Sequence, residues 1–178
     1  MTTQNLFSQN KEPEMISRYA ATFVRPSNGT VYAAGDVVCN AAGDVMNFFG
    51  ATDMRQGRIT AAKLSITNDN TTNGAFELFF FRDNANLPTL VDNAAFTMTA
   101  ACEDDLIGYT TFALESTGTS GGELAWDANT GLNILFTQKE TSGVLQGLYA
   151  VLVATAAYAP LAPASTVDVV IHIEDDRP

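Results

Sequence analysis

The sequence predicts an all-β fold, a jelly-roll-like antiparallel β-sandwich of about 8–10 strands with an extended N-terminal arm. Three observations lead to this prediction. Strong helix formers are scarce, with lysine only at 11, 63 and 139, whereas β-branched and turn-forming residues are abundant. Several windows alternate between apolar and polar residues with period two, and no long window has helical spacing. Clusters of Asn, Gly, Ser, Thr and Pro separate these windows.

Four windows alternate clearly enough to predict half-buried strands. In chain order they are 58–67, with Ala62, Leu64 and Ile66 inward; 74–81, with Phe76, Leu78 and Phe80 inward; 106–115, with Leu106, Thr110, Phe112 and Leu114 on one face; and 166–174, with Val167, Val169, Ile171 and Ile173 on one face. A fifth window, 148–158, is apolar on both faces, which predicts a central strand or an interface strand.

Shorter apolar runs predict further strands, and turn residues bound them. These weaker windows are 20–25, 36–40, 45–49, 95–99 and 132–137. The turns and loops expected between strands are 26–29, 68–74, 83–88, 116–122 and the Pro-containing connection 159–164.

The chain of 178 residues has the length of one domain, which we place at residues 18–178 after an arm at residues 1–17. The arm is polar with scattered apolar residues, among them Leu6 and Phe7. We find no signal peptide and no apolar run of the length of a membrane helix. No internal repeat is evident.

Charge and composition disfavour several function classes. Nine Lys and Arg against 20 Asp and Glu give a net charge of −11, which argues against binding to nucleic acid or to an anionic membrane surface. One histidine and two cysteines are too few for most zinc sites.

Several polar features have both a functional and a purely structural interpretation. The segment 69–74 has the opening of a calcium loop, but Phe80 stands where the bidentate glutamate belongs, so we expect a solvated hairpin loop. The acidic runs 103–105 and 174–176 fit a cation site if the fold or a subunit interface joins them, but we expect solvated turn and terminal residues. His172 has no nucleophile motif beside it. We therefore predict no catalytic residue, no metal site and no cofactor, and we do not expect an enzyme.

The two cysteines and the tryptophan leave alternatives open. Cys39 and Cys102 follow apolar residues, which favours free buried thiols over a disulfide. Trp126 is either an exposed platform or, as we favour, an anchor for the preceding Gly-rich loop. The 11 phenylalanines against one tryptophan and five tyrosines favour core packing over a carbohydrate site.

Certain phrases in the sequence match a pattern typical of virion proteins. They are Arg25-Pro26 with 31–38, the run 76–81 after an Asn/Thr-rich turn, Pro88 with 92–96, and 148–154 continuing through 157–160. Their order, over residues 19 to 174, resembles that of the head decoration (cement) proteins and related minor structural proteins of tailed bacteriophages.

The resemblance implies a jelly-roll-like sandwich, self-association, often as trimers, and attachment to the outer surface of the phage head through the major capsid protein. Synthesis in the host cytoplasm is implied as well, and the resemblance supplies no active site. We therefore predict a capsid decoration protein that stabilises the shell by bridging capsomers. The alternatives are a tail or fibre component that recognises a host receptor such as a glycan, and a small β-sandwich hydrolase.

Apolar residues also lie on the second faces of predicted strands. In a monomeric β-sandwich these faces would be exposed to solvent. They either become buried in an assembly or pack beneath loops. The candidate interface residues are Phe79, Phe81, Tyr149, Val151 and Val153, with Leu6 and Phe7 of the arm as anchors on a neighbouring subunit.

Overall fold

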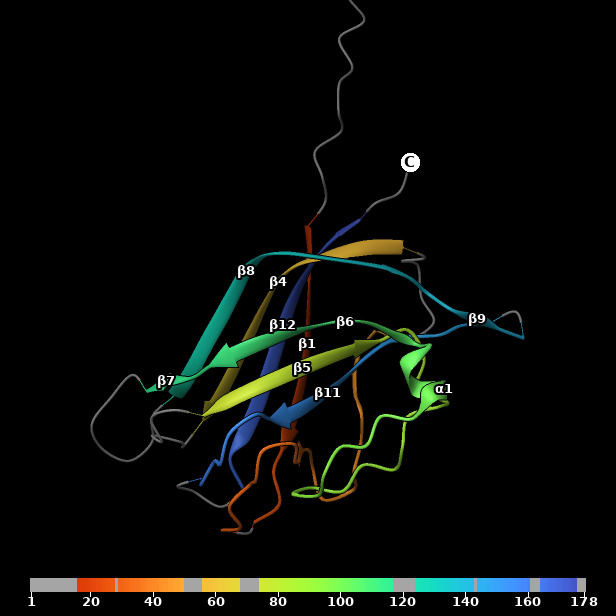
Figure 1. Cartoon of the computed structure of the whole chain (residues 1–178). Coiled ribbons are helices and arrows are strands. Elements are labelled where there is room, and N and C mark those ends of the chain that lie inside the picture. The colour runs from red at the N-terminus through yellow and green to blue at the C-terminus, as the bar shows by residue number, and fades with distance from the viewer. Residues whose placement is uncertain are drawn as a thin grey trace, which may run out of the picture.

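The computed structural model describes residues 16–27, 29–49, 56–67, 74–116, 124–142, 144–160 and 164–175, and only the backbone at 115–116 and 124–126. These ranges hold twelve strands and one short helix, α1 (Ala100–Glu103) (Figure 1). The strands are β1 (Ile16–Val24), β2 (Val37–Val38), β3 (Met46–Phe49), β4 (Gln56–Thr67), β5 (Ala75–Phe81), β6 (Leu106–Ala113), β7 (Glu115–Ser116), β8 (Leu124–Thr137), β9 (Glu140–Thr141), β10 (Val144–Leu145), β11 (Leu148–Ala154) and β12 (Thr166–Asp175).

Most strands belong to two antiparallel sheets. The first, which we name the β4 sheet, has the strand order β1-β12-β4-β8-β7. The second, the β11 sheet, has the order β2-β11-β5-β6, and β3 follows β2 along the same edge of β11. Strands β9 and β10 form a separate small hairpin.

The pairing of the strands defines the topology. Within the described residues the first strand pairs with the last, β1 with β12, and strands further along the chain pair with later ones in a nested order. Thus β2 and β3 pair with β11, β4 with β8, and β5 with β6. A long hairpin wrapped in this way into two sheets is a jelly roll, so the predicted fold class is confirmed.

The main core lies between the two sheets. The predicted alternation places Leu64 and Ile66 of β4 inward, where neither is exposed to solvent. Leu78 and Phe80 of β5 face them from the other sheet and are equally buried. Full burial of such a side chain contributes about 1.5–3 kcal/mol, so these inner faces stabilise the fold.

Side chains also close the seams between the sheets. At one seam Tyr19 of β1 packs on Phe49 of β3, with ring centroids 5.0 Å apart. At the other, the Asp127 carboxylate of β8 accepts a hydrogen bond of 2.8 Å from the backbone N–H of Ala113 in β6. The Asp127 contact occupies a backbone N–H of the edge strand β6 that would otherwise be open to strand pairing with another chain.

Some strand predictions need correction. Residues 95–99 form no strand, because only Ala95 makes an isolated bridge, with Asp36. Strand β8 covers 124–137, whereas only 132–137 was expected, since its first half lacks apolar alternation. The prediction that 148–158 holds a central strand is confirmed, because β11 lies between β5 and the β2 edge.

Two further corrections concern register and boundaries. Leu106 does not share the inward face of Thr110, because the pairing of β5 with β6 shifts between Phe80 and Phe81. Strand β1 begins at Ile16, which pairs with Glu174, so residues 16 and 17 belong to the sandwich and not to the arm. Residues 1–15, including Leu6 and Phe7, lie outside the described residues.

Candidate functional site

The outer face of the β11 sheet carries the residues predicted to form an interface. Residues 82–105, which we name the covering segment, connect β5 to β6 and contribute to a second core on this face. The buried members of that core are Val37, Cys39, Phe81, Leu90, Cys102, Val151 and Val153, and Phe79, Leu87, Phe96, Met98 and Tyr149 pack against it while partly buried.

Two predictions were open for these residues, burial in an assembly or packing beneath loops, and their positions in the single chain distinguish them. Phe81, Val151 and Val153 are 0%, 1% and 5% exposed, so they pack beneath the covering segment and are not on the surface. The physical reason is that the segment brings its own apolar side chains, such as Leu90, onto the face. Phe79 and Tyr149 remain half-buried at its margin.

Backbone hydrogen bonds attach the covering segment to the β2 region. The N–H of Val37 donates to the carbonyl of Ala94 at 2.9 Å, and the N–H of Phe96 donates to the carbonyl of Gly35 at 2.8 Å. Gly43 lies directly against the carbonyl of Leu90 and has a φ of +71°, so a side chain does not fit there.

A buried polar chain fixes the middle of the segment. The Arg25 side chain, only 1% exposed, donates from Nε to the Tyr32 hydroxyl at 2.7 Å. That hydroxyl donates to Oδ1 of Asp92 in the covering segment, also at 2.7 Å. Burial, reinforced by Asp92, raises the pKa of Tyr32 well above its ordinary value, so the hydroxyl keeps its proton.

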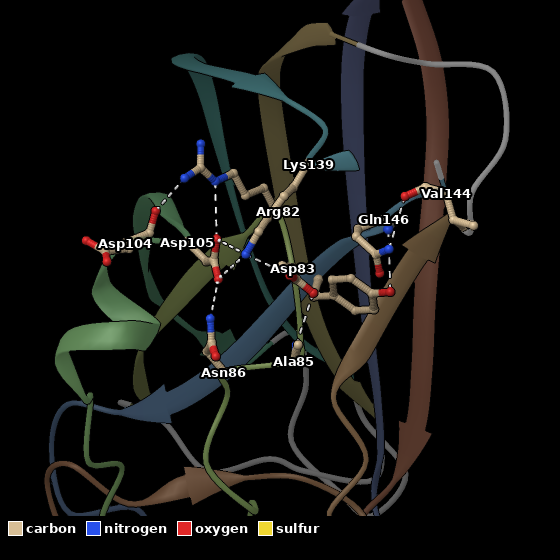
Figure 2. A network of polar contacts seen from close by, with 11 residues as sticks. Arg82, Asp83, Ala85, Asn86, Asp104, Asp105, Lys139, Val144 and Gln146 are labelled. Atoms are coloured by element: carbon tan, nitrogen blue, oxygen red, sulfur yellow. Dashed lines mark hydrogen bonds and ion pairs between the residues drawn. The ribbon is translucent and has the colours of Figure 1, made fainter. Parts of the chain in front are cut away.

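An ionic cluster, the Lys139 network, joins the two ends of the covering segment (Figure 2). The Lys139 ammonium lies 2.9 Å from the carboxylate of Asp83 at the start of the segment and 3.0 Å from that of Asp105 at its end. Asp105 also accepts hydrogen bonds from Asn86 at 3.0 Å and from Arg82 at 3.3 Å. One cation therefore ties both ends of the segment to the chain that follows β8.

The carboxylates of this network are buried, whereas its cations are partly exposed. Side-chain exposure is 4% for Asp83 and 3% for Asp105, against 33% for Lys139 and 41% for Arg82. Burial acts to raise the pKa of Asp105, but hydrogen bonds from Lys139, Asn86 and Arg82 outweigh it and lower that pKa. The hydrogen bonds to Asp83 and then Asp105 raise the pKa of Lys139.

The two cysteines lie in the second core as free thiols. Burial, with smaller contributions from Asp92 and Asp44, raises the pKa of Cys39 to about 12. Burial raises the pKa of Cys102 as well. Both therefore act as small apolar side chains, as expected from their sequence surroundings.

A shallow groove of about 360 Å³, which we name the outer groove, lies on the outer face of the β4 sheet. It is lined by Arg18, Ala61, Ala62, Lys63, Ala128, Thr130, Asp168, Val170 and His172. The pairings of β4 with β12 and with β8 both become irregular beside Thr60, whose hydroxyl donates to the carbonyl of His172 at 3.3 Å. Such irregularities bend strands, which gives this face its concavity.

The other residues that the sequence analysis weighed as candidates for a site are distributed as follows. His172 is exposed in the outer groove, on the polar side of its strand. Of the acidic run 103–105, Asp105 is engaged by Lys139, and of 174–176, Glu174 lies 3.9 Å from Arg58. Within the described ranges no three His, Cys, Asp or Glu side chains group as metal ligands. The segment 69–73 and the side chain of Trp126 lie outside the described residues.

Sequence reasoning missed the Lys139 network and the outer groove. Asp83 and Asp105 lie at opposite ends of the covering segment and Lys139 follows β8, and no local pattern links them. A signal for the groove was present, because Lys63 and His172 fall on the outward positions of two well-predicted strands. Their adjacency needed the strand order, which periodicity does not supply.

Comparison with known proteins gives no family. No family model and no curated protein matches the chain. Among solved structures, the chain is similar to a pilus of Bacillus endospore appendages, with 10% identity, 96% of this chain and 98% of that chain covered, and a TM-score of 0.26. It is also similar to Desmodium yellow mottle tymovirus, with 15% identity, coverage of 97% and 93%, and a TM-score of 0.29.

A third similar structure is that of Israeli acute paralysis virus, with 9% identity, coverage of 98% and 79%, and a TM-score of 0.31. Such scores are too low to assign a family, so the fold assignment rests on the strand order alone. This defines the class as a two-sheet jelly-roll protein. Among the described residues, no helix has the length and apolarity needed to cross a membrane.

Proposed function

We propose that this chain is a structural protein of a tailed-phage particle and, within that class, a decoration (cement) protein on the outer surface of the head. It binds the major capsid protein, self-associates as a homotrimer and stabilises the shell by bridging capsomers. Ligation of the assembled shell, and not of free capsomers, shifts the equilibrium toward assembly by mass action.

The observation that carries the proposal is the jelly-roll strand order in a chain whose phrases resemble those of phage decoration proteins. Jelly rolls recur in viral shells, and they also recur in lectins and cupins, so the fold supports the proposal by analogy. The internal organisation agrees with a rigid building block. Both apolar faces of the β11 sheet are covered, and the covering segment is fixed by the Lys139 network and by Asp92.

The test uses phage particles from which the chain has been removed by deleting its gene. These particles should disrupt at a lower temperature than complete particles, and adding the purified full chain should restore the original temperature. Restoration follows from preferential binding to the intact shell. Equal disruption temperatures for depleted and restored particles would contradict the cement function.

The arm is the proposed attachment element, with Leu6 and Phe7 as anchors on a neighbouring subunit. Deleting residues 1–15 should weaken binding to depleted particles and leave unfolding by urea unchanged, because β1 and both cores begin after the deletion. Binding measured by co-sedimentation checks this. Binding as strong as that of the full chain would exclude the arm as the attachment element.

A tail or fibre component that recognises a host glycan is the second candidate. It is favoured by Tyr109, which is 57% exposed and lies in a row of rings with Phe79 and Phe96, each neighbouring pair of centroids 5.8 Å apart. A supported, exposed aromatic ring offers an apolar platform with a polar tip. This function predicts saturable binding of host surface polysaccharide that Tyr109→Ala abolishes.

A further inference from the structure

Strand β1 forms one edge of the β4 sheet, and within the described ranges no strand pairs with its free side. It pairs with β12 over nine consecutive residues without a register shift, from Ile16 opposite Glu174 to Val24 opposite Thr166. A regular edge of this length presents a row of unpaired backbone N–H and C=O groups. Such a row is a template for pairing with another strand.

The sequence of β1 lacks the features that usually prevent edge pairing. The strand contains no proline, no lysine and no acidic residue, its one charged residue is Arg18, and its pairing with β12 has no bulge. The opposite edges of the two sheets differ from it. The β4 sheet ends there in the two-residue β7, and in the edge strand β6 the N–H of Ala113 is occupied by Asp127.

The outer face of β1 carries two apolar side chains that are open to solvent. Ile16 is 63% exposed and Val24 is 51% exposed, and they stand at opposite ends of the strand. The residues at the alternate positions between them, Arg18, Ala20 and Thr22, are exposed as well. Ala20 is the midpoint of the strand.

This order of residues is complementary to itself under a two-fold rotation. In an antiparallel pair of two β1 strands centred on Ala20, Ile16 of one copy lies opposite Val24 of the other. Directly opposite side chains in such a pair contact each other, so both exposed apolar ends become covered. Arg18 lies opposite Thr22, so the register places no two charged residues opposite each other.

A carboxylate also stands beside the position that Arg18 of a second copy takes in this register. Within one chain Thr22 pairs with Asp168 of β12, and its hydroxyl donates to Oδ1 of Asp168 at 2.6 Å. An arginine on the strand opposite Thr22 extends over the same face of the sheet toward Asp168. The rotation produces this contact twice, and complementary charges of this kind specify the register of an interface.

We propose that β1 is an interaction surface to which a second copy of this chain adds its own β1, antiparallel and with Ala20 opposite Ala20. The pairing joins the two β4 sheets into one continuous sheet across a two-fold axis. The proposal goes beyond the proposed function. A trimer needs a three-fold contact on another surface, so the β1 pair links a chain of one trimer to a chain of the next.

Disulfide trapping of the full chain tests the register. Ala20→Cys places two thiols on the two-fold axis, where directly opposite Cα atoms are about 4.5–5.5 Å apart, a separation that a disulfide spans. Mild oxidation should convert this variant into a covalent dimer. Thr22→Cys is the matched control, because its two thiols lie about 14 Å apart in this register and should stay unlinked. The native Cys39 and Cys102 are buried.

Sedimentation velocity tests the pairing without a covalent link. The wild type should dimerise with rising concentration at physiological ionic strength, where a screening length of about 8 Å limits the repulsion between copies of net charge −11. Ala20→Lys and Ala20→Glu should each weaken dimerisation about 100-fold, because like charges then face each other. An equimolar mixture of these two variants should restore it, since lysine then faces glutamate.

Urea unfolding checks that each variant is folded, as expected for changes at the exposed Ala20 and Thr22. A wild type that stays monomeric, lysine and glutamate variants that associate like the wild type, or a mixture that stays dissociated would each overturn the proposal. Equal trapping of Ala20→Cys and Thr22→Cys would overturn it as well. Absence of the chain from phage particles would overturn the proposed function and leave the pairing measured in solution unaffected.

Discussion

At Asp105, burial and hydrogen bonding act on one carboxylate in opposite directions. Burial opposes ionisation, but three donors, Lys139, Asn86 and Arg82, point at its two oxygens (Figure 2). The charged form prevails because each donor stabilises it, and the pKa falls below its ordinary value of 3.8. The covering segment is consequently held by a residue whose contribution depends on ionisation.

The lowered pKa of Asp105 determines how the stability of the fold depends on pH. A lowered folded-state pKa contributes stability that is fully present above the unfolded value and is lost as pH falls through the folded value. We expect Asp105→Asn to lower the free energy of unfolding at pH 6, and this difference to shrink as pH falls below 3.8. Urea unfolding at several pH values measures it. The neighbouring exposed Asp104→Asn serves as control, and a pH-independent difference for Asp105→Asn would contradict the assigned role.

Gly43 and Gly35 form a matched pair for substitution by alanine. Both have positive φ, +71° and +95°, so alanine strains either backbone by about 1–2 kcal/mol. A Cβ at Gly35 meets nothing within 4 Å, whereas one at Gly43 runs into the carbonyl of Leu90 in the covering segment. We expect Gly43→Ala to cost about 1–3 kcal/mol more than Gly35→Ala in urea unfolding. Equal costs would show that the segment does not rest on Gly43.

Among the elements, β11 shows how far sequence reasoning reaches. Its apolar residues on both faces predicted burial on both sides, and β11 is central in its sheet. The pattern did not reveal whether a neighbouring subunit or a loop covers Val151 and Val153. Periodicity shows which face of a strand is buried. The element that covers this face is determined by contacts between residues that are distant in the sequence.

The structure of the covering segment could not be predicted from the sequence pattern. Its apolar residues Leu90, Phe96 and Met98 lack a regular period because it packs without a continuous strand ladder. Within this segment the sequence pattern predicts a strand only at 95–99, and that prediction is wrong. The Lys139 network that fixes the segment joins residues far apart in the chain, so no local signal revealed it. Alternation predicted most of the sheet framework, whereas the contacts at its connections needed the tertiary structure.

A substitution at Phe81 tests whether the covering segment packs on the outer face of the β11 sheet. Since it is fully buried in the second core, Phe81→Ala should lower the free energy of unfolding by about 3–5 kcal/mol. Tyr109→Ala, at an exposed position of the adjacent strand, should cost less than about 1 kcal/mol. Urea unfolding compares them. A small cost at Phe81 would mean that the covering segment does not pack on this face in solution.

For the whole molecule, the jelly roll joins the first described strand to the last, β1 to β12, so its stability depends on pairings that are distant in sequence. Two cores share the β11 sheet, and polar contacts fix the segment that covers its outer side. The charged surface and the outer groove remain on the outside of this body. Such a block suits assembly through surface contacts, with little internal rearrangement.

The proposed place of this chain is the outer surface of a phage head, and its copy number per purified virion tests that placement. Quantitative mass spectrometry against the major capsid protein provides that number. The proposed decoration function predicts a ratio near parity with the major capsid protein, because a cement protein occupies repeated sites over the shell. A few copies per particle would contradict it and favour a tail or fibre component, and absence from the particle would refute a virion role altogether.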